Sequence, residues 1–333
     1  MIKIGLFGAG HLGKIHLRLL QELSDQYEVV GVCDRDEGVR AEVERDFAVP
    51  TYAEARDLLA VAEAVDIVVP TLSHAELASQ ALEAGRHVFI EKPVTHTVAE
   101  AEALLRLSQA HPQLKVQVGH VERFNPALLA VDTSDLKPMF IEGHRLAVYN
   151  PRGTDVSVIL DLMIHDLDVV LSLVPDPVRH ISASGVPVIS DSPDIANARI
   201  EFANGCVANL TASRISIKNM RRLRLFQRDT YLAVDFLKKT TERLRLTDAP
   251  TDDAPGLTQF PLNNGEKTRY LRFEQPEVQP VNAIRLELSE FARSIRDGAP
   301  MRVPLADGVR ALRVAHQILD TIEFGLRTAQ GKA

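Results

Sequence analysis

Cysteine, tryptophan and long apolar runs are scarce in this chain of 333 residues, and two of these shortages narrow its class. The chain has two cysteines, Cys33 and Cys206, and no tryptophan. Two cysteines cannot form a disulfide framework, so we expect a reducing compartment, the cytoplasm. No apolar run is long enough to span a bilayer, and glycines follow the short apolar start at once, unlike in a signal peptide.

An excess of positive charge is also missing. The 38 Lys and Arg residues are outnumbered by 45 Asp and Glu residues, which gives a formal net charge of −7. Such a protein offers no broad attraction to nucleic acid or to an anionic membrane, so we expect neither as a partner. The basic run Met220–Leu225 alternates like a half-buried strand with a charged outer face. No H-E-x-x-H or paired-cysteine spacing occurs, so we expect no metal.

What is present is a change of pattern near residue 121. Before it, short apolar runs at 2–7, 28–33, 65–69, 87–90 and 115–119 alternate with segments of helical spacing. Such units predict an α/β domain, 1–120, with a parallel sheet covered by helices on both faces. After it, a helix at 155–173 precedes several strand-like runs between 178 and 246, a loop at 247–266, and helices at 281–297 and 307–328. This order predicts a second domain, 121–333, with a largely antiparallel sheet.

A glycine-rich turn follows the first predicted strand. Residues 8–13 read Gly8-Ala9-Gly10-His11-Leu12-Gly13, a G-x-G-x-x-G that opens a predicted helix. In this context the first glycine allows a tight turn, the second a close approach of the backbone to a pyrophosphate, and the third close helix–strand packing. We therefore expect these six residues to bind a dinucleotide at the helix N-terminus, although a merely structural turn would read the same way.

The end of the second strand carries Asp34, 21 residues after Gly13. A carboxylate there can accept hydrogen bonds from the ribose hydroxyls of NAD and would repel the additional phosphate of NADP. Its neighbour Arg35 can contact such a phosphate, so NADP stays open beside NAD.

Two further groups carry chemistry. Lys92 follows the strand at 87–90, at the edge of the sheet where ligands bind, although a solvated loop lysine is an equal alternative. Asp161 and His165 lie four residues apart on a predicted helix and so share a face. A carboxylate beside an imidazole suits a general base that removes a hydroxyl proton. From spacing alone, a helix-surface ion pair or a histidine at a domain interface is the stronger reading.

Several motifs, taken in order, resemble the Gfo/Idh/MocA oxidoreductases, the family of glucose–fructose oxidoreductase and inositol dehydrogenase, over nearly the whole chain. The motifs are the glycine turn with His16, Pro70-Thr71-Leu72-Ser73-His74, Glu91-Lys92-Pro93, Gly119 with Arg123-Phe124-Asn125-Pro126, Asp161-x-x-x-His165, the Asn204-Gly205 hairpin and Asp307-Gly308. One departure is Leu72, where many members carry Asn. His120 and Glu122 resemble the variant of some nucleotide-sugar 3-dehydrogenase relatives.

The resemblance implies a Rossmann domain, an α+β domain with an open, mainly antiparallel sheet, and NAD(P)-dependent hydride transfer to or from a hydroxyl-bearing carbon of a sugar, cyclitol or nucleotide-sugar. Lys92 and His165 would be catalytic, with Asp161 as partner of His165 or as a substrate contact. Thr71, His74, Glu91 and Lys92 would contact the cofactor. The substrate would be contacted by Lys92, Arg123, Asn125, Asp161 and His165. The second domain would form a homodimer or homotetramer.

The alternative is a non-catalytic sensor of a cofactor or metabolite with the same fold. Lys92 and His165 argue against it, since a sensor has no need of proton transfer.

Overall fold

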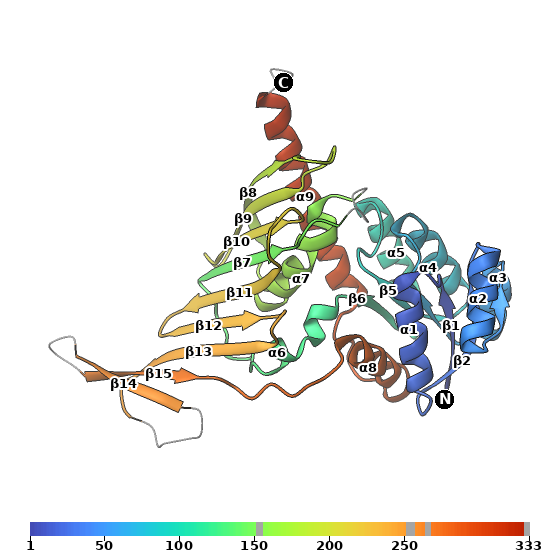
Figure 1. Cartoon of the computed structure of the whole chain (residues 1–333), viewed down its shortest axis with the longest axis horizontal. Helices are drawn as coiled ribbons and strands as arrows, with labels where there is room; N and C mark the ends of the chain where they lie inside the picture. Colours follow the sequence, from blue (N-terminus) through green and yellow to red (C-terminus); the bar gives the residue numbers. More distant parts are fainter. Residues whose placement is uncertain (151–155, 251–256, 264–267, 330–333) are drawn as a thin grey trace. The chain divides into compact units, whose positions relative to one another are not determined.

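The computed structural model describes residues 1–150, 156–250, 257–263 and 268–329 (Figure 1). It divides into two compact units, Met1–Phe124 with Val281–Arg313, and Asn125–Pro280 with Val314–Ala333. A division at residue 120 assigns Val281–Arg313 to the second domain, whereas the structure groups this segment with the first unit. The hydroxyl of Tyr27 donates to the carbonyl of Leu288 at 2.7 Å, one contact that anchors the late segment there.

The first unit is built on a six-stranded parallel sheet in the order β3-β2-β1-β4-β5-β6. This is the Rossmann order, and it confirms the predicted doubly wound sheet. The strands are β1 (Ile2–Phe7), β2 (Tyr27–Cys33), β3 (Thr51–Tyr52), β4 (Ala64–Ile67), β5 (His87–Glu91) and β6 (Val116–Gly119). The helices are α1 (His11–Glu22), α2 (Glu37–Phe47), α3 (Ala55–Val61), α4 (His74–Glu83), α5 (Val98–Ala110) and α8 (Ala283–Asp297), with 3-10 turns η1 (Thr71–Ser73) and η2 (Val121–Phe124).

Alternation along the strands assigns the helices to the two faces of this sheet. Ile4 on β1 shares a fully buried cluster with Leu20 of α1 and Phe291 of α8. The next residue, Gly5, points the other way, and a Cβ placed on it would lie 2.7 Å from Leu58 of α3. Helices α1 and α8 therefore cover one face together, and α3 lies on the other (Figure 1).

The second unit is built on a nine-stranded sheet in the order β14-β15-β13-β12-β11-β7-β10-β9-β8. Only β7 and β10 pair in parallel, so the sheet is mainly antiparallel, as expected. The strands are β7 (Phe140–Leu146), β8 (Val178–Val186), β9 (Ile195–Phe202), β10 (Val207–Ser213), β11 (Met220–Gln227), β12 (Thr230–Asp235), β13 (Thr240–Thr247), β14 (Leu257–Asn263) and β15 (Thr268–Glu274). The unit also holds α6 (Pro126–Leu129), the π-helical turn η3 (Ile159–Met163), α7 (Ile164–Leu173) and the C-terminal part of α9 (Leu305–Ala329).

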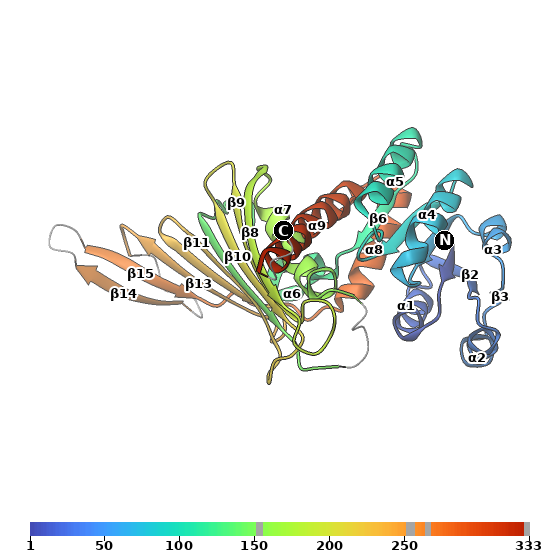
Figure 2. The same cartoon turned by 90° about the horizontal axis from the view of Figure 1, so that it is seen from above.

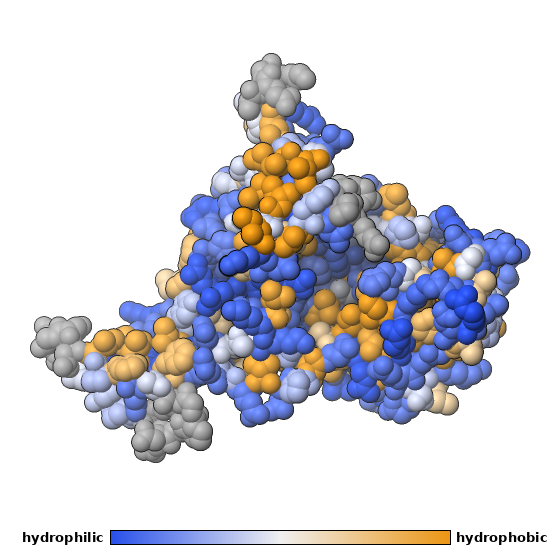
Figure 3. Space-filling model, viewed as in Figure 1, coloured by the Kyte–Doolittle hydropathy of each residue, from blue (hydrophilic) through white to orange (hydrophobic). Residues whose placement is uncertain are grey.

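One face of the nine-stranded sheet is covered by helices. Figure 2 shows α7 and the C-terminal part of α9 along that face, and no described helix on the other. The strands alternate accordingly: in β9 the residues Ala196, Ala198 and Ile200 are fully buried, whereas their neighbours are exposed. Apolar side chains nevertheless remain exposed on β14, at Phe260 and Leu262, and apolar colour also gathers over α9 (Figure 3).

Two strands of the second unit were not predicted from the sequence, and one predicted loop contains a strand. β7 and β15 were not predicted, and the loop expected at 247–266 contains β14, with 251–256 and 264–267 outside the described residues. β14 carries Pro261, which has no N–H to donate, and it pairs only with β15. An edge strand tolerates such a proline, so composition alone resembled a loop. Among the described residues, no helix has the length and apolar character needed to cross a membrane.

Candidate active site

The glycine turn occupies the space between β1 and α1 at the point where the strand order of the parallel sheet reverses. Gly8 adopts φ +87°, and a Cβ on it would lie 2.9 Å from the carbonyl oxygen of Val68. A Cβ on Gly13 would lie 2.1 Å from the carbonyl oxygen of Gly8, so both positions require glycine for the fold itself. Gly10 differs, because a Cβ there would meet nothing within 4 Å. The open space beside Gly10 fits the expected approach of a pyrophosphate.

The first turn of α1 has the donors that such a group needs. Gly10 is the N-cap, and no side chain caps the helix. The first amides of a helix have no partner within it, so His11, Leu12 and Gly13 present N–H groups and the positive end of the helix dipole. No acidic residue lies in this turn to compete with an anion. These features fit the diphosphate of a dinucleotide.

Asp34 links the end of β2 to the glycine turn. Its Oδ2 accepts from the amide of Ala9 at 2.9 Å, and its Oδ1 accepts from the amide of Asp36 at 3.0 Å. Two acceptor positions of the carboxylate remain for ribose hydroxyls. Arg40, which sequence reasoning missed, donates to the carbonyl groups of Asp34 and Arg35 at 2.8 and 3.1 Å and so fixes this loop.

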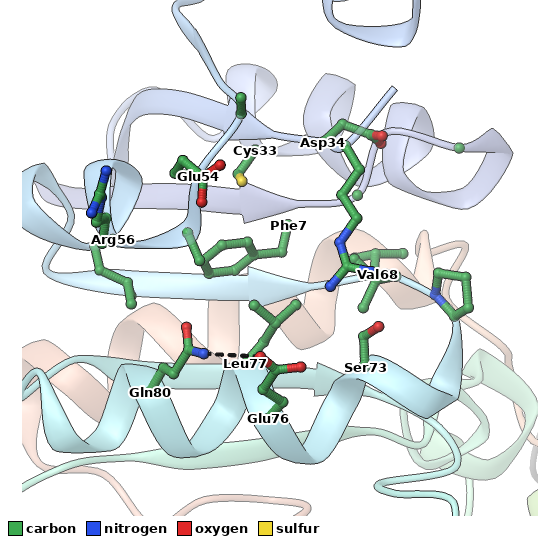
Figure 4. A pocket seen from close by; sticks show the side chains of 18 of the residues that line it. Phe7, Cys33, Asp34, Glu54, Arg56, Val68, Ser73, Glu76, Leu77 and Gln80 are labelled. Atoms are coloured by element: carbon green, nitrogen blue, oxygen red, sulfur yellow. Dashed lines mark hydrogen bonds between the residues drawn. The ribbon is translucent and has the colours of Figure 1, made fainter. Parts of the chain in front are cut away.

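A pocket of about 980 Å³ opens beside the glycine turn. Of the residues expected to bind cofactor, it is lined by Gly8, Gly10, His11, Leu12, Asp34 and Arg35. Figure 4 shows the Phe7 ring in its lining, with Glu54 and Arg56 from the segment after β3, and Glu76 and Gln80 from α4. The sequence reading did not select these last residues, although a segment that follows the carboxyl end of a parallel strand is where ligands bind.

The segment that carries Lys92 is held from two sides. The half-buried Lys92 donates its own backbone amide to the Glu91 carboxylate at 3.0 Å. The ring of His74 contacts the carbonyl of Pro93 through Nδ1 and the carbonyl of Val69 through Nε2, both at 2.9 Å. His74 is 1% exposed, and burial lowers its pKa. His74 therefore ties the end of β4 to the Lys92 segment, and its contact with a cofactor stays a prediction, like that of the half-buried Thr71.

Arg123 and Asn125, expected to contact substrate, both have structural partners. Arg123 donates to the Asp307 carboxylate at 2.6 Å, at the start of α9. Asn125 is buried, caps α6 by accepting from the Ala127 amide at 3.0 Å, and donates to the Phe236 carbonyl at 3.1 Å. Substrate contact by either side chain stays a prediction.

Asp161 and His165 lie on consecutive helical turns of the second unit. Asp161 belongs to η3 and His165 to α7, so the helix expected at 155–173 begins as a π turn, a feature frequent at functional sites. Residues 151–155 lie outside the described residues. Both side chains are half-buried, whereas Met163, Ile164 and most of α7 are buried. The two therefore share the accessible stripe of this helix.

A buried ion pair fixes that helix to the sheet. Arg145 on β7 donates through Nε and Nη2 to the two carboxylate oxygens of Asp166, at 3.0 and 2.7 Å, and both side chains are 3% exposed. Such a bidentate pair sets orientation as well as distance. Since Asp166 is the neighbour of His165, the pair fixes the direction in which His165 projects. The sequence reading missed Arg145 because it lies on the missed strand.

A second buried acid holds the start of the same helix. Asp194 accepts from the backbone amides of Val188, Ile189 and Ser190 at 2.7–3.0 Å. Although burial opposes ionisation, these donors lower the pKa of Asp194 to about 2. Its ion-pair partner Arg214 donates to the carbonyl of Val156, just before η3.

Comparison with known proteins agrees with this architecture. Residues 2–120 match the model of an oxidoreductase family with an NAD-binding Rossmann fold, GFO/IDH/MocA, and residues 142–229 match that of its C-terminal domain. The chain is 33% identical to UDP-N-acetylglucosamine 3-dehydrogenase of Acidithiobacillus ferrooxidans, over 98% of this chain and 99% of the relative. A solved structure of the enzyme with that name superimposes with a TM-score of 0.85, covering 97% and 98% of the two chains at 32% identity.

Proteins named as cyclitol dehydrogenases are also similar, over part of the chain in sequence or at lower identity in fold. Inositol 2-dehydrogenase of Salmonella typhimurium is 31% identical over 50% of this chain and 53% of its own length. A structure of scyllo-inositol dehydrogenase from Lactobacillus casei with NAD(H) has a TM-score of 0.76 at 21% identity and 98% coverage of both chains, which shows a shared fold. The chain is thus a member of the GFO/IDH/MocA oxidoreductase family, with that family's NAD-binding Rossmann domain and its C-terminal domain.

Proposed function

We propose that the protein is an NAD-dependent dehydrogenase that acts on a sugar-ring hydroxyl of a nucleotide-sugar of the UDP-N-acetylglucosamine class. The observation that carries this proposal is the similarity to a UDP-N-acetylglucosamine 3-dehydrogenase along both units, at 33% identity over 98% of the chain. The inositol dehydrogenases match in sequence over a smaller part of the chain, 31% identity over 50% in one case, and along the whole chain in fold at 21% identity, so a cyclitol is the second candidate.

The reaction removes a hydride from the carbon and a proton from its hydroxyl, which leaves a ketone. When NAD is bound, its nicotinamide accepts the hydride. Lys92 donates a hydrogen bond to the reacting oxygen and stabilises the negative charge that develops there. The His165 imidazole takes the hydroxyl proton, and Asp161 orients that ring or contacts the substrate. In the opposite direction, His165 returns the proton and the ketone is reduced.

The cofactor pocket favours NAD over NADP in this proposal. Asp34 faces the site where the additional phosphate of NADP would lie, and the two carboxylates Glu54 and Glu76 also line the pocket. Arg35 and Arg56 line it as well and offer the opposing charge. We expect the affinity for NADH to exceed that for NADPH, and Asp34→Ser to reduce the difference.

We also propose a cytoplasmic homodimer or homotetramer. Both cysteines are buried and free, which agrees with a reducing compartment. The nine-stranded sheet leaves one face without a described helix, and Phe260, 55% exposed, lies on its edge strand β14. An exposed apolar edge strand can pair with another chain, which supports the proposal. A mass corresponding to one subunit in light scattering at micromolar concentration would contradict this.

The test is NADH formation from NAD with purified protein and separate UDP-N-acetylglucosamine, UDP-glucose, myo-inositol and scyllo-inositol. We expect turnover with the first and little with the cyclitols. Turnover with a cyclitol alone would overturn the nucleotide-sugar assignment. Tight NADH binding with no turnover on any substrate, in either direction, would favour the sensor alternative.

A further inference from the structure

Four ionisable side chains from four elements meet inside the first unit, on the side covered by α1 and α8. They are His16 on α1, Asp66 on β4, Glu91 on β5 and Glu287 on α8, hereafter the His16 cluster. His16, Asp66 and Glu287 are 0% exposed and Glu91 is 8% exposed. Three buried acids around one base lower the stability of the folded state unless protons or hydrogen bonds compensate their charges. Such an arrangement therefore suggests a function for the cluster.

The two ring nitrogens of His16 each face a carboxylate. Nδ1 is hydrogen-bonded to Oδ2 of Asp66 at 2.9 Å, whereas Nε2 lies at ion-pair distance, 3.4 Å, from Oε1 of Glu91 and makes no hydrogen bond among the described residues. A neutral imidazole has one N–H and would turn a lone pair toward one of these carboxylates, whereas an imidazolium directs an N–H toward each. Burial opposes the charge, but Asp66 and Glu91 outweigh it and raise the pKa of His16 well above its ordinary value.

Glu287 is the member that holds a proton of its own. Neither carboxyl oxygen has a hydrogen-bond partner, although the backbone carbonyl of the same residue accepts from Gln117 at 2.9 Å. Burial first, and then the nearby charge of Glu91, raise the pKa of Glu287 well above its ordinary range. The two acids that face His16 directly differ: burial raises the pKa of Asp66 although His16 opposes this, whereas for Glu91 the neighbouring His16 and Lys92 outweigh burial and lower the pKa.

Glu91 connects the cluster to Lys92. Its Oε1 faces His16, while Oε2 accepts the backbone amide of Lys92 at 3.0 Å. The carboxylate also packs closely against the backbone of Gly119: a Cβ at that position would lie only 2.7 Å from Oε1. The position of the Glu91 carboxylate is thus set by His16 on one side and Gly119 on another, and it sets the backbone from which Lys92 projects.

We propose that His16 is a positioning residue for the dehydrogenase reaction: as a buried cation between Asp66 and Glu91, it holds the Glu91 carboxylate on the Lys92 amide and so fixes Lys92. This inference rests on the proposed function, since Lys92 is the residue that contacts the reacting oxygen there. His16 is too deeply buried to touch substrate, so it acts only through Glu91.

The experiment compares His16→Gln, Glu91→Gln and the double variant with Leu20→Ala, a matched control. Leu20 is also fully buried on α1, but it lies in the apolar cluster and carries no charge. We expect His16→Gln to lower kcat roughly tenfold to a hundredfold, since a small displacement of a reacting group costs that much, with KM and the Kd for NADH little changed. Leu20→Ala should lower Tm and leave kcat within about twofold when assayed well below its Tm.

The double variant separates positioning from general damage. If His16 acts through Glu91, His16→Gln/Glu91→Gln should have about the kcat of the more severe single variant. The uncompensated negative charge of the His16 variant is also removed, so part of its Tm should return. Multiplicative losses in kcat, together with additive losses in Tm, would overturn the proposal.

Gly119→Ala displaces the same carboxylate without touching His16, and it serves if His16→Gln does not fold. The added Cβ meets the end of a flexible side chain, so we expect a folded protein with lowered kcat and unchanged NADH affinity. Wild-type kcat in Gly119→Ala would contradict the link from Glu91 to Lys92.

Two further outcomes are decisive. Ligand atoms of His16, Glu91 and Glu287 lie within 4.8 Å of one another, so elemental analysis of the purified protein is included. A stoichiometric metal lost in His16→Gln would show that a metal ion, not a proton, compensates the acids, and would overturn the proposal. If wild-type protein turns over no substrate, the proposed function fails, whereas the Tm cycle between His16 and Glu91 still decides whether the two side chains are coupled.

Discussion

The two units surround their buried acids with different partners. In the second unit Arg145 pairs with Asp166 and Arg214 with Asp194, and a third buried acid, Asp168, lies on α7. The first unit buries three acids around the single base His16, directly behind the segment that carries Lys92. In an ion pair the two opposite charges compensate each other, so the pair can orient a helix. A cluster with more acids than bases is not compensated in this way, which suggests that it has a role beyond stability. We infer that the ion pairs orient the helix that carries His165, whereas the His16 cluster positions the segment that carries Lys92.

The largest expected effects on kcat come from replacing one proposed catalytic residue in each unit, His165 and Lys92. His165→Ala removes the proposed general base, and such groups contribute roughly 10²–10⁴-fold, so kcat should fall by about that factor. Lys92→Ala should lower kcat by about 10²–10³-fold through lost stabilisation of the developing charge. Steady-state kinetics and NADH titration measure both. Undiminished turnover in either variant contradicts the role assigned to it.

The matched pairs of the second unit should be costly to break on one side. Asp166→Ala leaves Arg145 buried and unpaired, which we expect to lower the free energy of unfolding by about 3–5 kcal/mol. The control is Glu201→Ala, which breaks the exposed pair with Arg199 and should cost about 1 kcal/mol or less. Urea denaturation followed by circular dichroism measures both, and equal losses would contradict the contrast between buried and exposed pairs.

Two positions of the glycine turn, Gly13 and Gly10, should separate effects on the fold from effects on cofactor binding. Gly13→Ala places a Cβ 2.1 Å from a backbone oxygen and should lower Tm by several degrees, about 1–3 kcal/mol by analogy with overpacking. Gly10→Ala adds a methyl group in open space, so Tm should stay within about a degree while the NADH Kd rises at least about tenfold. Differential scanning fluorimetry and calorimetry decide this. Wild-type NADH affinity in Gly10→Ala would show that the pyrophosphate binds elsewhere.

The smallest expected effect concerns pH and the His16 cluster. The folded-state pKa values of His16 and Glu287 are both raised, so their contributions to stability are complete at low pH and decline as the pH rises through those raised values. The other two members of the cluster, Asp66 and Glu91, face these groups, and Tyr27 and Lys92 lie close enough to interact electrostatically with Asp66 and Glu91 respectively.

Glu287→Gln removes one of these declining contributions. As the pH rises above the ordinary pKa of a glutamate, the unfolding free energy of this variant should fall less steeply than that of the wild type. Glu290→Gln on the same helix should follow the wild type. Identical slopes for Glu287→Gln and the wild type would contradict a protonated Glu287.

The sequence predicted the parts of the site that depend on local pattern. The glycine turn, Asp34 and the Lys92 segment each follow an apolar strand, and a parallel sheet brings such ends to one edge. Asp161 and His165 were placed on a helix correctly, but the π turn was not expected, because its widened hydrogen bonding leaves no mark in apolar spacing.

The parts that were missed depend on contacts distant in sequence. Glu287 is one of several charged residues on an amphipathic helix, and nothing local marks it as the one turned inward. Arg145 reads as a solvent-facing charge at the end of β7, yet it is buried because Asp166 faces it. Arg56 lines the cofactor pocket only because β3 pairs beside β2. The burial of a side chain and the residue that it contacts decide these roles, and the local sequence pattern predicts neither.

The most direct measurement is anaerobic incubation of the purified protein with NAD and UDP-N-acetylglucosamine that carries deuterium on the sugar-ring carbon whose hydroxyl is oxidised. NADH is followed by absorbance and the sugar by mass spectrometry. We expect one deuterium to be transferred to the nicotinamide for each keto-sugar formed. NADH binding at the glycine turn with no transfer from any nucleotide-sugar or cyclitol would contradict it.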